Sequence, residues 1–263
     1  MTETGRFVWY DLMTTDLPAA KDFYAHVMGW NIAHAGMPGT DYTLARREAV
    51  PVGGMMTLPD AVRAQGGRAG WMGYVAVADV DAASADLRAA GGTIHRAPED
   101  IPGIGRFCVA ADPQGAVFVL FRGAGPLPPA PPPGTPGHFG WHELHTRDWE
   151  AAFAFYAPLF GWVKTDAVDM GPMGTYQLFG APGPDAGCGG IHTGGMMTNV
   201  QAPAPFWLYY VNVEDIDAAG SRIAEGGGRV VSGPHQVPGG AWTVQALDPQ
   251  GAMFALVGPR ASA

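Results

Sequence analysis

The sequence predicts an α+β protein in which a strand–helix–three-strand (βαβββ) unit occurs four times in tandem. Three observations predict this architecture: the two halves of the 263-residue chain repeat each other, a Pro-rich segment separates them, and the strand–helix pattern recurs inside each half. Hydrophobic residues make up 47% of the chain and charged residues 15%, which is typical of a packed globule and not of a disordered chain.

The internal repeat is clearest in two pairs of segments. DLPAAKDFYAHVMGW at residues 16–30 matches DWEAAFAFYAPLFGW at 148–162, and ADPQGAVFVLF at 111–121 matches LDPQGAMFALV at 247–257. Because both matches are long and occur in the same order, we interpret the chain as the product of a duplication.

The Pro-rich segment lies between the two halves. Residues 123–137 read GAGPLPPAPPPGTPG, a composition that favours extended polyproline conformation and cannot join the interior of a sheet. We interpret it as a linker between a first domain at 1–122 and a second at 138–263. A ligand for a Pro-binding module is the alternative interpretation of the same segment.

Each quarter of the chain is expected to contain one helix and four strands. The helix near 17–28 has apolar residues at helical spacing, with Asp16 as its N-cap and Gly29 at its C-terminus. The second helix is expected at 80–92. The strands expected in the first half are 9–15, 30–34, 42–46, 54–58, 71–79, 93–96, 106–111 and 116–121.

Composition excludes several classes of partner and location. With 24 acidic and 15 basic residues the formal charge is −9, and the chain lacks the cation clusters that bind nucleic acid or an anionic membrane surface. No apolar run approaches the roughly 20 residues of a membrane span, and residues 1–6 do not read as a signal peptide. Two cysteines, at 108 and 188, exclude a disulfide framework and a Cys-rich zinc site, and leave a single bridge between them open. We expect a cytoplasmic protein.

The motifs resemble those of a known family. Paired βαβββ units, FYxxVxGW at the end of the first helix (residues 23–30) and DPxG before the last strand (112–115) are similar to the vicinal oxygen chelate superfamily, which includes glyoxalase I, extradiol dioxygenases and bleomycin resistance proteins. The tandem arrangement resembles a bacterial group of "hydroxylase" proteins that includes a mycobacterial antigen. The resemblance covers all but the linker, and implies that each half curls its sheet into a cupped half-barrel around a ligand cavity.

The resemblance also indicates where a metal would bind in metal-dependent members of the family. Counted from an aspartate at the start of each helix (Asp16, Asp81, Asp148 and Asp217) and from the DPxG turns, the ligand positions carry Trp9, Met72, Val119, Trp141, Leu208 and Ala255. None of these side chains offers the carboxylate, imidazole or thiolate that divalent cations require. We therefore expect neither a metal nor another cofactor.

Other side chains should point into the cups instead. Strand alternation puts Asp11 and Met13 on the face of Trp9, and Glu143 and His145 on the face of Trp141. Further residues expected to bind ligand are Met72, Tyr74, His192, Leu208, Tyr210, Asn212 and Gln245. The second cup is the more polar, so we expect any chemistry there.

One of these assignments depends on how the halves are aligned. GGMMT occurs at both 53–57 and 194–198, but we set the first copy against GGIHT at 189–193. In that alignment His192 takes the place of Met56.

Each candidate residue has a structural alternative. Trp9 and Trp141 either stack on a planar ligand or simply fill the space of the lost metal. Asp11 and Glu143 either work on a ligand or bond to neighbouring backbone or arginine. His145 and His192 could instead be ordinary core or surface residues, or could form an unusual metal site with Glu143.

The expected function is the binding of a small apolar or aromatic metabolite without a metal. Glu143 and His145 would be the acid and base of a lyase, an isomerase or a hydroxylase-like enzyme. The alternatives are a non-catalytic protein that sequesters a drug or metabolite, and a metal-dependent glyoxalase or dioxygenase. Pseudo-symmetry within one chain suggests a monomer or a weak homodimer.

Overall fold

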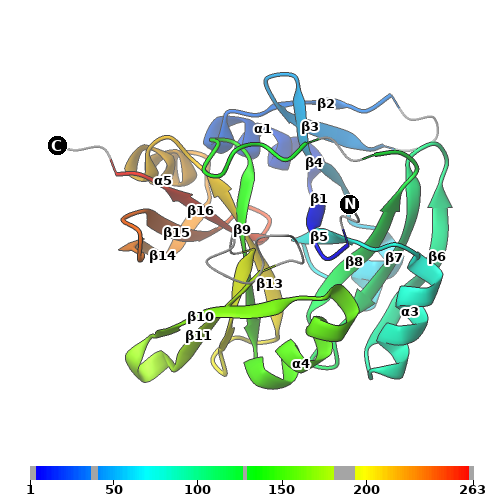
Figure 1. The fold of residues 1–263 in the computed structure, drawn as a ribbon. Helices are drawn as coiled ribbons and strands as arrows, with labels where there is room; N and C mark the ends of the chain where they lie inside the picture. The colour runs from blue at the N-terminus through cyan, green and yellow to red at the C-terminus, as the bar shows by residue number, and fades with distance from the viewer. Residues whose placement is uncertain (1–3, 37–40, 127–128, 181–192, 261–263) are drawn as a thin grey trace. The chain divides into compact units, whose positions relative to one another are not determined.

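The computed structural model describes residues 4–36, 41–126, 129–180 and 193–260, drawn in Figure 1. These residues form sixteen strands, five α-helices and a short 3-10 helix, η1 (Gly171–Met173). The strands belong to two mixed eight-stranded sheets, β1–β8 and β9–β16. The predicted α+β class with four βαβββ units is confirmed. No helix among the described residues has both the length and the hydropathy needed to cross a membrane.

Both halves of the chain follow the predicted element order. The first half contains β1 (Phe7–Thr14), α1 (Leu17–Met28), β2 (Asn31–His34), β3 (Thr43–Arg47), β4 (Val50–Thr57), α2 (Asp60–Ala64), β5 (Gly70–Ala76), α3 (Val80–Ala89), β6 (Thr93–Ile101), β7 (Gly105–Ala111) and β8 (Val117–Gly123). The second half contains β9 (Phe139–Thr146), α4 (Trp149–Phe160), β10 (Val163–Asp169), β11 (Thr175–Gly180), β12 (Gly194–Thr198), β13 (Phe206–Asn212), α5 (Ile216–Glu225), β14 (Arg229–Gln236), β15 (Trp242–Leu247) and β16 (Met253–Gly258). In every quarter the first strand pairs in parallel with the last, because the intervening helix carries the chain back across the sheet. Helix α2 and the 3-10 helix η1 were not expected.

The chain forms two compact units, and each unit takes one quarter from each half. Unit 1 comprises Met1–Trp9, Gly73–Pro129 and Trp141–Leu208, and unit 2 comprises Tyr10–Met72, Ala130–Gly140 and Tyr209–Ala263. The described residues between β8 and β9 form turns without helix or strand. That residues 1–122 and 138–263 are separate domains stays a prediction.

Aspartates start the four long helices. Asp16, Asp79, Asp148 and Asp215 are extended N-caps whose carboxylates accept backbone N–H groups of the first turn. The chain leaves α1 and α4 through Gly29 and Gly161, which adopt the left-handed conformation at φ 67° and 70°. The predicted caps of α1 are both confirmed.

The FY and DPxG motifs form a buried hydrogen-bonded connection in each unit. In unit 1 the hydroxyl of Tyr156 on α4 donates to Asp112 Oδ2 (3.1 Å) and accepts from Trp207 Nε1 (3.1 Å). In unit 2 the hydroxyl of Tyr24 on α1 donates to Asp248 Oδ2 (3.2 Å) and accepts from Trp71 Nε1 (2.9 Å). Each connection joins a helix of one half to the DPQG turn of the other. The hydrogen bonds of the signature motifs therefore connect the two quarters that make up each unit.

Candidate functional site

The face of β9 brings together three predicted site residues of unit 1. Trp141 is half-buried, whereas Glu143 and His145 are only 8% and 5% exposed. They alternate along a strand that pairs in parallel with β12, where Glu143 lies opposite Gly195 and His145 opposite Met197. The predicted common face of these side chains agrees with their contacts to one another.

A chain of hydrogen bonds runs along this face. Trp141 Nε1 donates to the hydroxyl of Tyr176 on β11 at 2.8 Å, and that hydroxyl donates to Glu143 Oε2 at 2.9 Å. A Cβ atom at Gly195 would collide with the Tyr176 ring, so glycine is required for Tyr176 to reach Glu143. Tyr176 was not predicted as a site residue.

His145 makes three contacts of different kinds. Its Nε2 lies 2.6 Å from Glu143 Oε1, the distance of an ion pair, although Nε2 makes no hydrogen bond within the described residues. Its Nδ1 lies 3.0 Å from the amide nitrogen of Asn199. The ring stacks on Phe206 with the centroids 4.7 Å apart and the planes 9° from parallel. Contacts at both ring nitrogens and on one ring face therefore hold the His145 side chain in place.

Unit 2 contains a simpler counterpart on β1. Asp11 is 3% exposed, and its Oδ1 accepts from the hydroxyl of Tyr42 at 2.6 Å. Asp11 lies opposite Gly54, whose missing side chain leaves room for Tyr42, as Gly195 does for Tyr176. The two carboxylates therefore occupy equivalent positions, each with a tyrosine partner.

The strand register corrects one alignment. Met56 pairs with Met13 on β1, and Met197 pairs with His145 on β9. GGMMT at 53–57 therefore corresponds to GGMMT at 194–198, and the alignment that set Met56 against His192 was wrong. More residues separate β11 from β12 than separate β3 from β4, and the identical motif follows the longer of these segments. His192 itself lies outside the described residues.

The remaining predicted site residues differ in their hydrogen bonds and in their burial. Tyr210 accepts a hydrogen bond from Gln245 Nε2 at 3.0 Å. Asn212 Nδ2 donates to the carbonyl of His138 at 2.9 Å, which gives its amide a structural partner. The other candidates range from fully buried to half-buried: Leu208, Tyr74, Trp9, Met13 and Met72.

Sequence reasoning missed four residues that contact the predicted ones. These are Tyr42, Tyr176, Asn199 and Phe206. One signal was present: DYTL at 41–44 and TYQL at 175–178 place a tyrosine at the same point of each half. Asn199 and Phe206 have no such repeat, because the first half has Leu58 and Gly70 at the corresponding places.

His142 lies on the opposite face of β9 and belongs to the core. Its ring stacks on Phe7 with centroids 4.0 Å apart, and its Nδ1 lies 2.6 Å from the carbonyl of Thr193. Burial lowers the pKa of His142 to about 4, against the weaker opposing effect of the Thr193 hydrogen bond. His142 is therefore neutral at neutral pH.

The positions that would hold a metal carry no donors for one. Val119, Leu208 and Ala255 are completely buried apolar side chains. Over the ranges that the structure describes, no cluster of three or more His, Cys, Asp or Glu residues could hold an ion. The residues at these positions do not fit the metal of the metal-dependent relatives, because none of them has a carboxylate, imidazole or thiolate.

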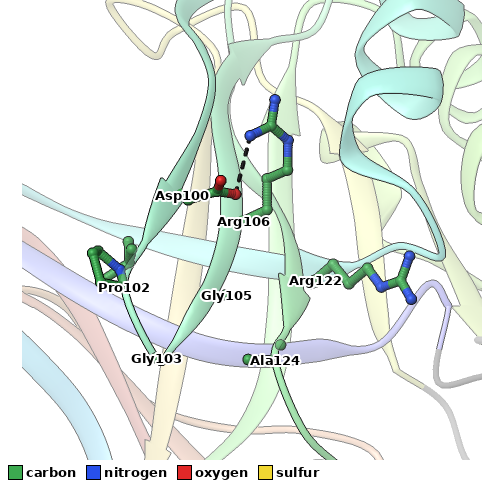
Figure 2. Close-up of a pocket in the computed structure, with 9 residues that line it drawn as sticks. Asp100, Pro102, Gly103, Gly105, Arg106, Arg122 and Ala124 are labelled. Atoms are coloured by element: carbon green, nitrogen blue, oxygen red, sulfur yellow. Dashed lines mark hydrogen bonds and ion pairs between the residues drawn. The ribbon is translucent and has the colours of Figure 1, made fainter.

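A shallow hollow of about 300 Å³ lies elsewhere in unit 1, near the hairpin that joins β6 and β7 (Figure 2). Arg106 beside it is bound by Asp81 at 2.7 Å and Asp100 at 3.0 Å, and its guanidinium lowers the pKa of Asp81. In Figure 2 the side chain of Arg122 points away from the Arg106–Asp100 pair. No predicted site residue lines this hollow.

The fold and the repeated signature motifs indicate the class of protein. The chain belongs to the Glyoxalase/Bleomycin resistance protein/Dioxygenase superfamily, whose family model matches residues 6–120 and 135–256. The resemblance in the sequence motifs is thereby confirmed, including its tandem form.

Two relatives are similar along nearly their whole length. The anthracycline biosynthesis protein DauV of Streptomyces sp. (strain C5) is 32% identical over 265 residues, which cover 96% of this chain and 93% of DauV. CFP32 of Mycobacterium bovis is 30% identical over 254 residues, which cover 95% of this chain and 94% of CFP32.

Solved structures show the same fold at lower identity. The Mn(II)-bound glyoxalase from Novosphingobium aromaticivorans matches with a TM-score of 0.66 and 16% identity, covering 98% of this chain and 83% of the other. The 2,3-dioxygenase LapB from Pseudomonas sp. KL28 matches with a TM-score of 0.65 and 16% identity, covering 99% and 94%. These similarities concern the fold alone.

Proposed function

We propose that the chain binds a small, largely apolar or aromatic metabolite at the β9 face and transfers a proton on it without a metal. The observation that carries this proposal is the buried contact between Glu143 and His145, beside the indole of Trp141. A carboxylate and an imidazole held together are the usual groups of general acid–base catalysis. Lyase, isomerase and hydroxylase-like reactions all include such a proton transfer.

The relatives support an aromatic ligand. DauV and DnrV, each 32% identical to this chain, are named for the biosynthesis of anthracyclines. Trp141 offers a half-buried planar ring next to the acid–base pair, and such a ring suits stacking on a planar ligand. A planar aromatic compound therefore fits both the relatives and the residues.

The second candidate function is binding without turnover. The superfamily description includes bleomycin resistance proteins, and the β1 face has the carboxylate of Asp11 but Met13 at the place of His145. A protein that only sequesters its ligand needs a binding face and no acid–base pair. Measuring whether product forms distinguishes the enzyme from the sequestering protein.

Ligand binding and turnover are best tested on one set of variants. Anthracyclines and simpler anthraquinones would be titrated by calorimetry, and product would be followed by chromatography. We expect Trp141→Ala to weaken binding about tenfold or more, since it removes a large contact and the hydrogen bond to Tyr176. We expect Glu143→Gln to lower turnover about 10²- to 10⁴-fold with the fold intact.

The control for the charge change is Glu150→Gln, on the exposed first turn of α4. Binding without product in the wild type would favour the sequestering protein. Stoichiometric iron, zinc, nickel or manganese in protein purified without a metal-binding tag, measured by mass spectrometry, would contradict metal independence.

A further inference from the structure

The surroundings of His145 determine which ring nitrogen carries the proton. Asn199 Oδ1 accepts from the backbone N–H groups of Gln201 (3.2 Å) and Ala202 (3.1 Å). The amide oxygen is therefore fixed on that side, and the amide NH₂ faces His145 Nδ1 at 3.0 Å. Nδ1 accepts a hydrogen bond, so the proton of neutral His145 is on Nε2.

The loop that carries Asn199 is held in place. The Arg147 guanidinium donates to the carbonyls of Val200 (2.9 Å) and Pro203 (3.0 Å). The backbone N–H of Asn199 donates to the carbonyl of Thr146 at 2.7 Å. These bonds fix the amide in relation to β9, so the orientation of Asn199 follows from several contacts and not from one.

Nε2 lies beside the carboxylate of Glu143, but their contact does not have the geometry of a hydrogen bond. Oε2 accepts from Tyr176, and Oε1 lies 2.6 Å from Nε2. A neutral carboxyl would have to turn its own proton against one of these neighbours, so the group is arranged to accept. Nε2–H is buried and makes no hydrogen bond to the described residues, which leaves it as a donor for a ligand.

The first half lacks every part of this arrangement except the carboxylate and its tyrosine. Met13 replaces His145, and Leu58 replaces Asn199 although its N–H makes the equivalent bond to Thr14, at 2.8 Å. Gly70 and Thr15 stand where the second half has Phe206 and Arg147. The supports of His145 thus occur together with it, in one half only.

We propose that Glu143 is the proton acceptor, that His145 is a hydrogen-bond donor to a ligand oxygen, and that Asn199 is the residue that positions His145 for this role. The ligand class is a carbonyl compound with a removable proton on a conjugated hydroxyl or on the adjacent carbon. This inference rests on the proposed function and divides its chemistry between the two residues.

The transfer is balanced within the ligand and Glu143. The O–H or C–H bond of the ligand breaks, its proton goes to a carboxylate oxygen of Glu143, and the electron pair is delocalised onto the carbonyl oxygen. The negative charge that develops there is stabilised by Nε2–H of His145. Neutral His145 has no lone pair on Nε2 with which to take the proton itself.

The first test reads the tautomer by ¹H–¹⁵N NMR of the imidazoles at pH 8. We expect the wild type to have His145 protonated on Nε2. Asn199→Asp replaces the donor at Nδ1 by an acceptor of the same shape, so we expect Nδ1 of His145 to become protonated. His142, whose Nδ1 faces the Thr193 carbonyl, should stay protonated on Nδ1 and is the internal reference.

The second test uses 1,4-dihydroxyanthraquinone, whose visible absorption moves to longer wavelength when a hydroxyl ionises. We expect the wild type to bind the ionised form, Glu143→Gln to lose the ionised spectrum, and Asn199→Asp to bind it about tenfold more weakly. Asn31→Asp makes the same chemical change on exposed β2 and should leave binding unchanged.

The outcomes separate the inference from the proposed function. If His145 in the wild type is protonated on Nδ1, or if Asn199→Asp does not change the tautomer, the assignment of roles is overturned while aromatic binding can still stand. If the tautomers are as expected but the wild type binds no aromatic probe, the proposed function and the ligand class fall and the positioning role of Asn199 stands.

Discussion

Two histidines three positions apart lie on opposite faces of β9, and the face determines which ring nitrogen is protonated. His142 is buried against Phe7 on one face, and His145 meets Glu143 and Asn199 on the other. The carbonyl of Thr193 selects the Nδ1 proton of His142, whereas the amide of Asn199 selects the Nε2 proton of His145. The same residue type therefore serves packing in one place and the candidate site in the other.

The pKa of His142 makes stability depend on pH. Because it is about 4 in the folded protein and 6.5 in the unfolded chain, the unfolded state binds the proton more readily between these values. This contribution to the free energy of unfolding is complete above about pH 7 and falls with acidification, by about 2 kcal/mol at pH 5. Urea unfolding at pH 7.5 and 5 measures it.

His142→Gln is the matched variant for that measurement, because a neutral amide can still donate to Thr193. We expect the fall between pH 7.5 and 5 to be smaller in His142→Gln by about the same 2 kcal/mol. Equal pH dependence in both proteins would show that His142 titrates normally.

Tyr156 is the residue whose loss should most disturb unit 1. Tyr156→Phe removes the donor to Asp112 and the acceptor for Trp207, so two buried polar groups lose a partner. We expect the free energy of unfolding to fall by about 1–3 kcal/mol, measured by denaturant unfolding. Tyr24→Phe makes the equivalent change in unit 2 and should lower the free energy of unfolding by a similar amount. If neither variant changes the free energy of unfolding, these hydrogen bonds do not contribute to stability.

At the level of elements, close packing between strands depends on glycine in β12. A Cβ at Gly195 would meet the Tyr176 ring, so Gly195→Ala should displace Tyr176 from Glu143 and lower the free energy of unfolding by about 1–3 kcal/mol. Gly220→Ala on α5 meets nothing within 4 Å and should instead stabilise by about 1 kcal/mol. Thermal unfolding of both variants tests the contrast in sign.

The elements that could be predicted are those with local signals. The range 17–28 for α1 is confirmed because its cap, its apolar spacing and its terminal glycine all lie within the helix itself. The alignment of GGMMT failed because two glycine-rich motifs lie close together in the sequence and no local signal indicates how many residues separate β11 from β12. Helix α2 lacks a side-chain cap and a buried face, and this explains why it was missed.

The same distinction applies to the candidate site. Glu143 and His145 could be placed on one face because alternation along a single strand is a local property. Tyr176 and Asn199 reach that face from β11 and from the loop after β12, so their contacts depend on strand register and loop path. A single sequence does not encode these in a readable pattern.

At the level of the whole molecule, each unit needs both halves of the chain. Residues 1–122 alone lack Asp248, the partner of Tyr24, and residues 138–263 alone lack Asp112, the partner of Tyr156. We expect the two fragments to form a 1:1 complex when expressed together, and the first fragment alone to self-associate or unfold. Size-exclusion chromatography with light scattering measures this. A monomeric 1–122 that unfolds cooperatively would contradict the expectation.

The sequence separation of the hydrogen-bonded pairs also determines the order in which the two units can fold during synthesis. Tyr156 and Asp112 are 44 positions apart, whereas Tyr24 and Asp248 are 224 positions apart. A ribosome releases the chain from its N-terminal side, so helix α1 must wait until Asp248 has been made before it meets its partner turn. Unit 1 can close before Asp248 is made, and α1 therefore finds its final contacts long after its own synthesis.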